Sequence, residues 1–150
     1  MRAAAYAICL LVLASCAGRQ HAEVPTAFQI RFGLLAGSTE SALKVDAETL
    51  RFVHRVATPW PFYGFEILPA RYSPYTLQTI LYLPGPPSAI RGNLTGLPTD
   101  YRSGIRSRTN TFTGRTVVGY RFDEGDPIGS YRLVVVVNGK IERQIEYVIE

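Results

Sequence analysis

The sequence lacks cysteine beyond residue 16, because Cys9 and Cys16 are its only two cysteines. Disulfide bonds and cysteine metal sites are therefore excluded from the rest of the chain. Lysine is also rare: of the 16 basic residues, all but Lys44 and Lys140 are arginines. The formal net charge of +4 is too small to indicate nucleic-acid binding. We expect no nucleic-acid partner.

Residues typical of catalysis are scarce as well. His54 is the only histidine beyond residue 21, so a zinc site or a nucleophile–base pair would have to be built on it alone. A single histidine in an alternating strand is more typical of a core or surface position. The Gly-x-Ser-x-Gly pattern of serine hydrolases is absent. We predict no catalytic residue, no cofactor and no metal; paired carboxylates stay an open alternative, since their separation is a spatial fact.

Length and composition indicate one folded domain. The chain has 150 residues, of which 47% are hydrophobic and 19% charged, as in globular proteins. Nine tyrosines, seven phenylalanines and ten prolines against one methionine favour strands and turns over helices. We expect a single domain over residues 26–150.

The N-terminus has the pattern of an export signal. A positive start is followed by an apolar stretch over residues 3–17, which at 15 residues is too short to cross a bilayer. Its end, Leu-Ala-Ser-Cys at residues 13–16, resembles the lipobox of bacterial lipoproteins. The resemblance implies that residues 1–15 are a signal peptide and that Cys16 is acylated. Residues 16–25 would then be a lipidated tether in which His21 is linker rather than ligand.

The same segment allows a second interpretation. Ala17 after the cysteine favours the outer membrane, facing the periplasm, in the sorting pattern of such lipoproteins. However, Ser15-Cys16-Ala17 also fits ordinary secretory cleavage, which would release a soluble periplasmic protein. Acylation is favoured, because the cysteine stands at the end of the apolar run.

Strand patterns recur along the remaining chain, with turn residues between them. They cover residues 28–34, 50–56, 62–68, 75–83 and 116–122, and a terminal hairpin. Residues 40–48 instead have the spacing of a short helix, with Ser38 as its cap. About seven strands without βαβ alternation predict an all-β fold, an antiparallel β-sandwich of immunoglobulin-like architecture.

The terminal hairpin carries Asn138-Gly139 between residues 131–137 and 140–149. A two-residue turn would place Tyr131 on the same face as Glu146, whereas a three-residue loop ending in a bulge at Gly139 would place it with Ile145. Because burial decides register, we predict the three-residue loop. Ile141, Ile145, Tyr147 and Ile149 would then share the face of Tyr131, Leu133 and Val135.

Three segments carry a family resemblance: residues 28–33 (FQIRFG), residues 75–77 (YTL) and residues 129–140. They resemble a family of uncharacterised exported bacterial proteins, small sandwiches ending in a Gly-x-Trp/Tyr strand and a hairpin. Tyr131 stands where tryptophan is commoner, and residues 88–113 depart from the pattern. The resemblance implies a sandwich fold and does not indicate any activity.

Residues 91–121 have the most unusual charge of the chain, with six arginines against one acid, Asp100. Their centre, residues 101–108, is rich in Gly and Ser and predicts a long exposed loop. Arginine guanidinium groups bind carboxylates and phosphates in a bidentate geometry, through two parallel hydrogen bonds. A soluble loop without a binding role is the plainer alternative. The candidate partner-binding residues are Tyr101, Arg102, Arg106, Arg108 and Trp60. Trp60 lies on a rigid aromatic stretch, which packing in the core would also explain.

Asp123-Glu124-Gly125-Asp126 concentrates three carboxylates. Oxygen ligands at this spacing could hold calcium, but Asp and Gly are also what a tight turn between strands requires. The spacing does not match a known calcium loop, so the turn is favoured.

The function predicted from the sequence is non-catalytic. We expect a lipid-anchored envelope protein that binds another envelope component, such as a protein, an anionic lipid or peptidoglycan. One alternative is a structural lipoprotein subunit of a trans-envelope secretion or assembly machine, which a partner strand could join at a sheet edge. The weakest alternative is an enzyme, which would need a cleft at His54 or at the Asp123 cluster.

Overall fold

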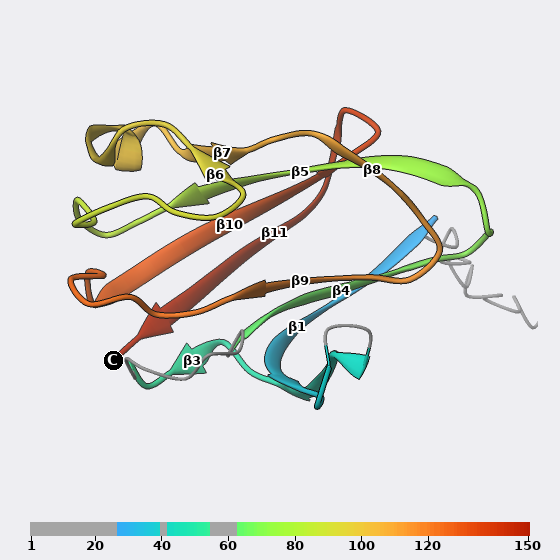
Figure 1. Ribbon diagram of the computed structural model, residues 1–150, viewed down its shortest axis with the longest axis horizontal. Helices are drawn as coiled ribbons and strands as arrows, with labels where there is room; N and C mark the ends of the chain where they lie inside the picture. The colour runs from blue at the N-terminus through green and yellow to red at the C-terminus, as the bar shows by residue number, and fades with distance from the viewer. Residues whose placement is uncertain (1–26, 40–41, 55–62) are drawn as a thin grey trace, which may run out of the picture.

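The computed structural model describes residues 27–39, 42–54 and 63–150, which form two β-sheets packed face to face (Figure 1). Sheet A has the strand order β2-β1-β4-β9 and sheet B the order β3-β11-β10-β5-β7-β6, with β8 also paired to β5. All pairs are antiparallel except β3 with β11. The predicted all-β sandwich of immunoglobulin-like architecture is confirmed, but the described residues form eleven strands instead of about seven, several of them short.

The strands of sheet A are β1 (Phe28–Ala36), β2 (Lys44–Glu48), β4 (Tyr63–Pro69) and β9 (Thr116–Tyr120). Those of sheet B are β3 (Arg51–Phe52), β5 (Pro74–Tyr82), β6 (Leu94–Thr95), β7 (Ile105–Ser107), β8 (Asn110–Thr113), β10 (Gly129–Val137) and β11 (Lys140–Ile149). A short 3-10 helix, η2 (Pro98–Arg102), precedes β7. Among the residues that the structure describes, no helix is long and apolar enough to cross a membrane.

Alternation of apolar residues builds the core between the sheets. Every second residue of the long strands faces the opposite sheet, as the period of two requires. Rings from both sheets meet there: Phe32 of β1 lies 5.0 Å from Tyr147 of β11, centroid to centroid. The buried core includes Ile30, Phe32, Phe65, Ile67, Tyr75, Leu77, Leu133, Val135, Ile145 and Tyr147.

The terminal hairpin corrects one prediction. Val137 pairs with Lys140, so Asn138 (φ 50°) and Gly139 (φ 77°) form a two-residue turn with both residues left-handed, not a three-residue loop. Burial is satisfied instead by a bulge within the hairpin, where the register shifts between Val135 and Val136. Tyr131 therefore faces Tyr147 as burial requires, while Ile141 stays exposed, contrary to the prediction.

Two other predictions from local pattern were wrong. Within the predicted helical stretch, Lys44–Glu48 forms β2, because Val45 is buried and the strand pairs with β1; residues 40–41 lie outside the described part. Residues 101–108 are not one long exposed loop, because η2 and β7 occupy most of them and Ile105 is buried. The predicted strand over residues 50–56 shortens to Arg51–Phe52, with residues 55–56 outside the described part.

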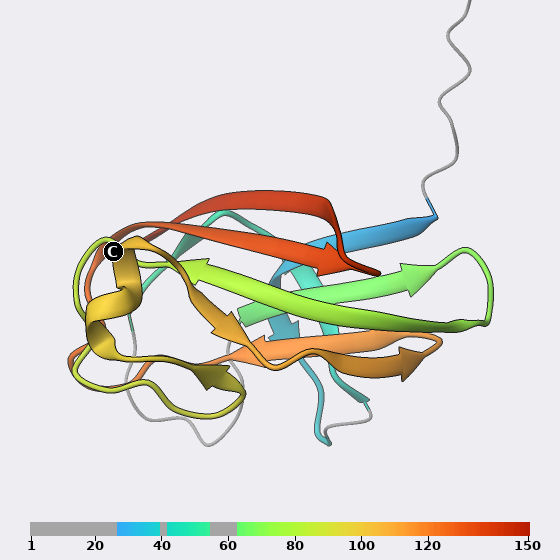
Figure 2. The same cartoon turned by 90° about the horizontal axis from the view of Figure 1, so that it is seen from above.

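One segment changes sheets. β8 pairs with β5 in sheet B, and two residues later β9 pairs with β4 in sheet A. Gly114 lies at this crossing with φ 73°, and a Cβ there would approach the Tyr72 ring to 2.8 Å. In Figure 2 the golden-orange arrow of β8 points to the right, and the chain then turns back into the orange arrow of β9, which points to the left. This crossing makes β9 an edge strand of sheet A.

The sandwich has two distinct ends. Phe28 at the start of β1 pairs with Pro69 at the end of β4, and Leu34 pairs with Tyr63 at the start of β4. The described chain therefore begins at one end, while β5 ends, β10 begins and the C-terminus lies at the other (Figure 1).

Candidate functional site

A pocket of about 330 Å³ lies at the end of the sandwich opposite to the start of β1. Its wall is formed by β9, β5, β7, the segment over residues 83–94 and the turn over residues 123–126. The volume is within the range of ligand pockets, which begins at about 300 Å³. Apolar side chains (Leu81, Leu83, Leu94, Ile105, Val118) form much of the lining.

The pocket exists because sheet B is wider than sheet A. Tyr75 donates a hydrogen bond to Thr116 Oγ1 (2.6 Å), and the Tyr120 hydroxyl donates to Thr79 Oγ1 (3.5 Å), so β9 lies over β5. Beyond β5, sheet B continues with β7 and β6, whereas sheet A ends at β9. The inner side chain of Ile105 in β7 thus faces the pocket instead of a strand of sheet A.

Three tyrosines form the polar part of the pocket wall. Tyr63 and Tyr120 pack with ring centroids 5.5 Å apart, and Tyr131 stacks on Tyr147. Burial raises the pKa of Tyr120 to about 12 and raises the pKa values of Tyr63 and Tyr131 well above the ordinary range. These hydroxyls stay protonated at neutral pH, and each bonds within the protein: Tyr63 to Tyr147, Tyr120 to Thr79, and Tyr131 to the Pro127 carbonyl.

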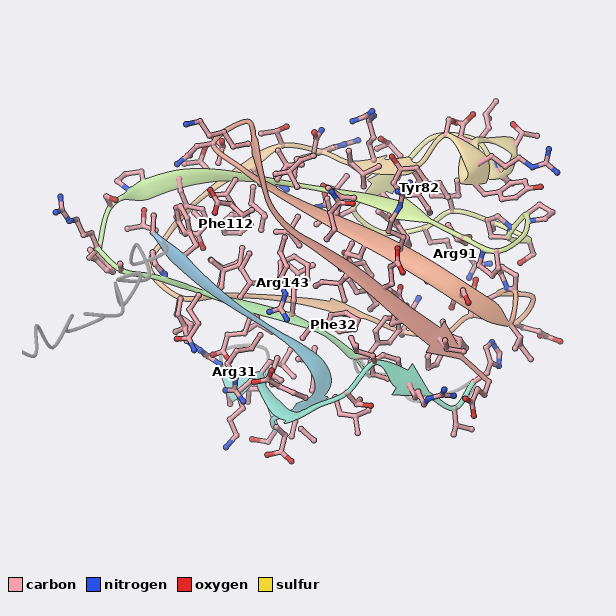
Figure 3. The ribbon with its side chains drawn as sticks, turned by 180° about the vertical axis from the view of Figure 1, so that it is seen from behind. Arg31, Phe32, Tyr82, Arg91, Phe112 and Arg143 are labelled. Carbon is pink, nitrogen blue, oxygen red and sulfur yellow. The ribbon has the colours of Figure 1, made fainter. Side chains whose placement is uncertain are left out.

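Four charged residues stand at the pocket rim. Arg121 lies 3.5 Å from Asp123, and Asp126 Oδ2 accepts a hydrogen bond from the Asp123 backbone N–H (2.8 Å). Burial raises the pKa of Asp126, although the Asp123 N–H opposes the shift. Arg91 has no ion pair with any residue in the described ranges. Figure 3 shows Arg91 at the same end of the molecule as Tyr82, which is the last residue of β5.

The acidic segment is a turn. The Asp126 backbone N–H donates to the Asp123 carbonyl (3.1 Å), and Gly125 supplies the left-handed residue with φ 86°. This geometry is what the sequence favoured for the segment. Within the described residues, no three His, Cys, Asp or Glu side chains gather closely enough to hold a metal ion.

His54 lies close to this turn without lining the pocket. Its ring is 5.2 Å from that of Phe122, and its charge lowers the pKa of Asp126, the smallest of the effects on that carboxyl. Its Nε2 is buried and has no hydrogen-bond partner among the described residues. The histidine is therefore half-buried beside the pocket end.

The candidate arginine surface lies apart from the pocket. Arg102 Nε donates to the hydroxyl of Tyr101 (2.8 Å) in η2, and its guanidinium lies 5.4 Å from that ring's centroid. Arg106 pairs with Ile80 on the outer face of sheet B, and Arg108 is exposed after β7. None of these four residues lines the pocket, whereas two other arginines of the same segment, Arg91 and Arg121, do. Cys16 and Trp60 lie outside the described residues.

Sequence reasoning missed the tyrosines and the β9 edge as parts of a site. One signal was present in the sequence: residues 116–120, Thr-Val-Val-Gly-Tyr, form a strand without any charged residue inside the arginine-rich stretch over residues 91–121, between Arg115 and Arg121. Edge strands in natural proteins usually carry charges.

Comparisons with known proteins add a fold likeness. No family model matches the chain, and no curated protein matches it. A solved structure of an immunoglobulin-like protein from Pseudomonas aeruginosa is similar, with 16% sequence identity and a TM-score of 0.48 over 81% of this chain and 92% of that one.

Proposed function

We propose that this protein is a lipid-anchored component of the bacterial envelope that binds another envelope component, without catalysing a reaction. The proposal joins the lipobox-like segment ending at Cys16 with the pocket at the far end of the sandwich. The binding site that we propose is the pocket, not the arginine surface around Arg102.

The position of the pocket carries the proposal. The first strand, β1, begins at Phe28, opposite Pro69, while the pocket lies at the Tyr63 end of β4. The six residue steps of β4 between these two points span about 20 Å. A protein tethered through its N-terminus would thus have its pocket turned away from the anchoring membrane and accessible to the periplasmic space.

The chemistry of the pocket supports binding over catalysis. A general base must be able to accept a proton near neutral pH, but burial keeps the Tyr120 hydroxyl protonated, with a pKa of about 12. The Asp126 carboxylate already accepts the Asp123 N–H and closes a turn. An apolar wall with a few fixed polar groups is typical of a recognition site.

Two alternatives each have one observation in their favour. A structural subunit of a trans-envelope machine would use the edge of β9 that no described strand pairs with and that borders the pocket. An enzyme would use the two rim carboxylates of Asp123 and Asp126, which meet the expectation of a cleft at this cluster. Their roles in closing the turn make catalysis the weaker of the two.

In-cell photo-crosslinking tests the proposed function. The full-length chain would carry a photoreactive residue in place of Ala89 at the pocket, or in place of exposed Asp46 in β2 as the matched control. We expect an adduct with an envelope component at position 89 and none at position 46. Adducts of equal yield at both positions, or none at either, would contradict a binding role for the pocket.

A further inference from the structure

We propose that the pocket's occupant is an extended segment of a partner polypeptide, which pairs with the free edge of β9 as an added strand of sheet A. Its apolar side chains would enter the pocket, and an acidic side chain would face Arg91. This inference rests on the proposed function, because it names the chemistry of the component that the pocket binds.

The edge of β9 has free backbone groups. A Cβ added at Gly64 would lie 2.0 Å from the Val118 carbonyl oxygen, so this carbonyl faces β4. Backbone groups alternate sides along a strand, and those of Val117 and Gly119 therefore face the other edge. In the part of the chain that the structure describes, β9 pairs with β4 alone, so this edge is open to a further strand.

The pocket lies where the inward side chains of such a strand would point. Thr116, Val118 and Tyr120 are the inward residues of β9, as shown by their pairing with Ile67, Phe65 and Tyr63, all of which are buried in the core. A strand paired to β9 would continue this alternation above β7 and β6. The space that its inward side chains would fill is the pocket, whose wall includes Leu94 and Ile105.

A polypeptide fits these features better than a small molecule. The edge offers a row of alternating N–H and C=O groups, which an extended backbone satisfies in register, while the pocket selects alternate side chains. Within the described part of the chain, Arg91 at the pocket rim has no ion pair. An acidic side chain in the partner segment would provide that pair.

Nuclear magnetic resonance with a defined probe tests the inference. The probe is a short peptide of alternating valine and glutamate, added to the full mature protein, and its control is the same peptide with lysine in place of glutamate. We expect the glutamate peptide to slow amide exchange at Val117 and Gly119 by about tenfold or more, and exchange in β2 to stay unchanged. The lysine peptide should bind far more weakly.

Two variants locate the contact. Val117→Pro removes an amide from the free edge and should abolish the protection at Gly119. Ala89→Trp narrows the pocket and should abolish the protection at both Val117 and Gly119. Circular dichroism of each variant would establish that it is folded, and Asp46→Pro on the β2 edge is the matched control that should leave peptide binding intact. If Val117→Pro does not fold, the loss or retention of protection in Ala89→Trp decides whether the peptide contacts the pocket.

The outcomes separate this inference from the proposed function. Shifts of pocket residues without protection at Val117 and Gly119 would overturn strand addition and leave a pocket that binds in another way. No response to either peptide would overturn the inference, while an in-cell adduct at position 89 would still support the proposed function. Concentration-dependent protection of the same amides without peptide would make a second copy of this chain the occupant and would also overturn it.

Discussion

The two edges of sheet A have opposite chemistry. β2 carries Lys44, Asp46 and Glu48 among its five residues, and its register with β1 shifts between Leu34 and Leu35. β9 has the same length but no charged residue, and its pairing with β4 runs without a shift. Charges and bulges are the features with which proteins prevent edge strands from pairing with other chains.

This difference indicates which edge of sheet A is available for contact with another chain. β2 has both protective features, whereas β9 has neither and borders the pocket. An unprotected apolar edge is a liability for aggregation unless something covers it. We infer that the edge of β9 has no protective charge or bulge because a partner strand pairs with it.

The largest effect is expected from separating each edge strand from its neighbour. A Cβ at Gly64 would clash with the Val118 carbonyl oxygen, and one at Gly33 with the Ala47 carbonyl oxygen, both at 2.0 Å. Gly64→Ala should lower the free energy of unfolding by about 3 kcal/mol and Gly33→Ala by about 2 kcal/mol, because Val118 and Tyr120 of β9 pack against the hydrophobic core cluster, to which no residue of β2 belongs. Urea denaturation measures both. Equal losses would mean that β9 is held no more firmly than β2.

The second effect concerns ion pairs on the outer face of sheet A. Glu66 is buried, with 4% of its surface exposed, and pairs with Arg115, just before β9, and with Arg31. Glu48 in β2 also pairs with Arg31, but its side chain is 55% exposed. Glu66→Gln should cost about 2 kcal/mol, below the range for fully buried pairs, because both arginines are partly exposed. Glu48→Gln should cost less than about 0.5 kcal/mol. Thermal denaturation measures both variants, and similar losses of stability for Glu66→Gln and Glu48→Gln would contradict this prediction.

The third effect is a dependence on pH at the end of β9. The pKa of Tyr120 is raised to about 12, so the fold favours its neutral form. Its contribution to stability is fully present below about pH 10 and is lost as the pH rises toward about 12. We expect a loss of about 1 kcal/mol over this range, allowing for solvent around the part-exposed ring. Tyr120→Phe should reduce this loss in denaturation curves, and an unchanged loss would place its cause elsewhere.

The smallest effect on stability is expected from exchanging the edge chemistry. Val117→Lys should give β9 a protective charge, and Asp46→Val should remove one from β2, each changing stability by only about 0.5 kcal/mol. Light scattering on warming should show slower aggregation for Val117→Lys and faster aggregation for Asp46→Val. The opposite order would show that β9 is not the exposed edge that we describe.

Much of the fold could be predicted from residue alternation. The long strands bury one face each, so residues such as Phe32, Leu133 and Ile145 indicate their own orientation. The hairpin shows the limit of this reasoning: burial required that Tyr131 face the same side as Ile145, but it could be achieved by a longer loop or by a bulge. The structure uses the bulge, because Asn138 and Gly139 already form a favourable two-residue turn.

The candidate site could not be predicted in this way. The pocket depends on β9 lying over β5 while β7 and β6 extend beyond it, and no local pattern gives the relative width of two sheets. Short strands such as β7 could not be predicted either, because they depend on contacts that are distant in sequence. Ile105 is buried by its neighbours in space, although the surrounding stretch has the Gly, Ser and Arg content typical of loops. The arginine count drew attention to residues 91–121, but Arg91 and Arg121 line the pocket, whereas Arg102, Arg106 and Arg108 do not.

In-cell crosslinking tests most directly whether the pocket end binds the partner. The envelope component crosslinked to the native protein would be quantified for the wild type, for Ala89→Trp at the pocket, and for a triple variant with Arg102, Arg106 and Arg108 changed to Ser. We predict that Ala89→Trp loses the partner and that the triple variant retains it. Retention by Ala89→Trp together with loss in the triple variant would contradict the account and place the binding surface on the outer face of sheet B.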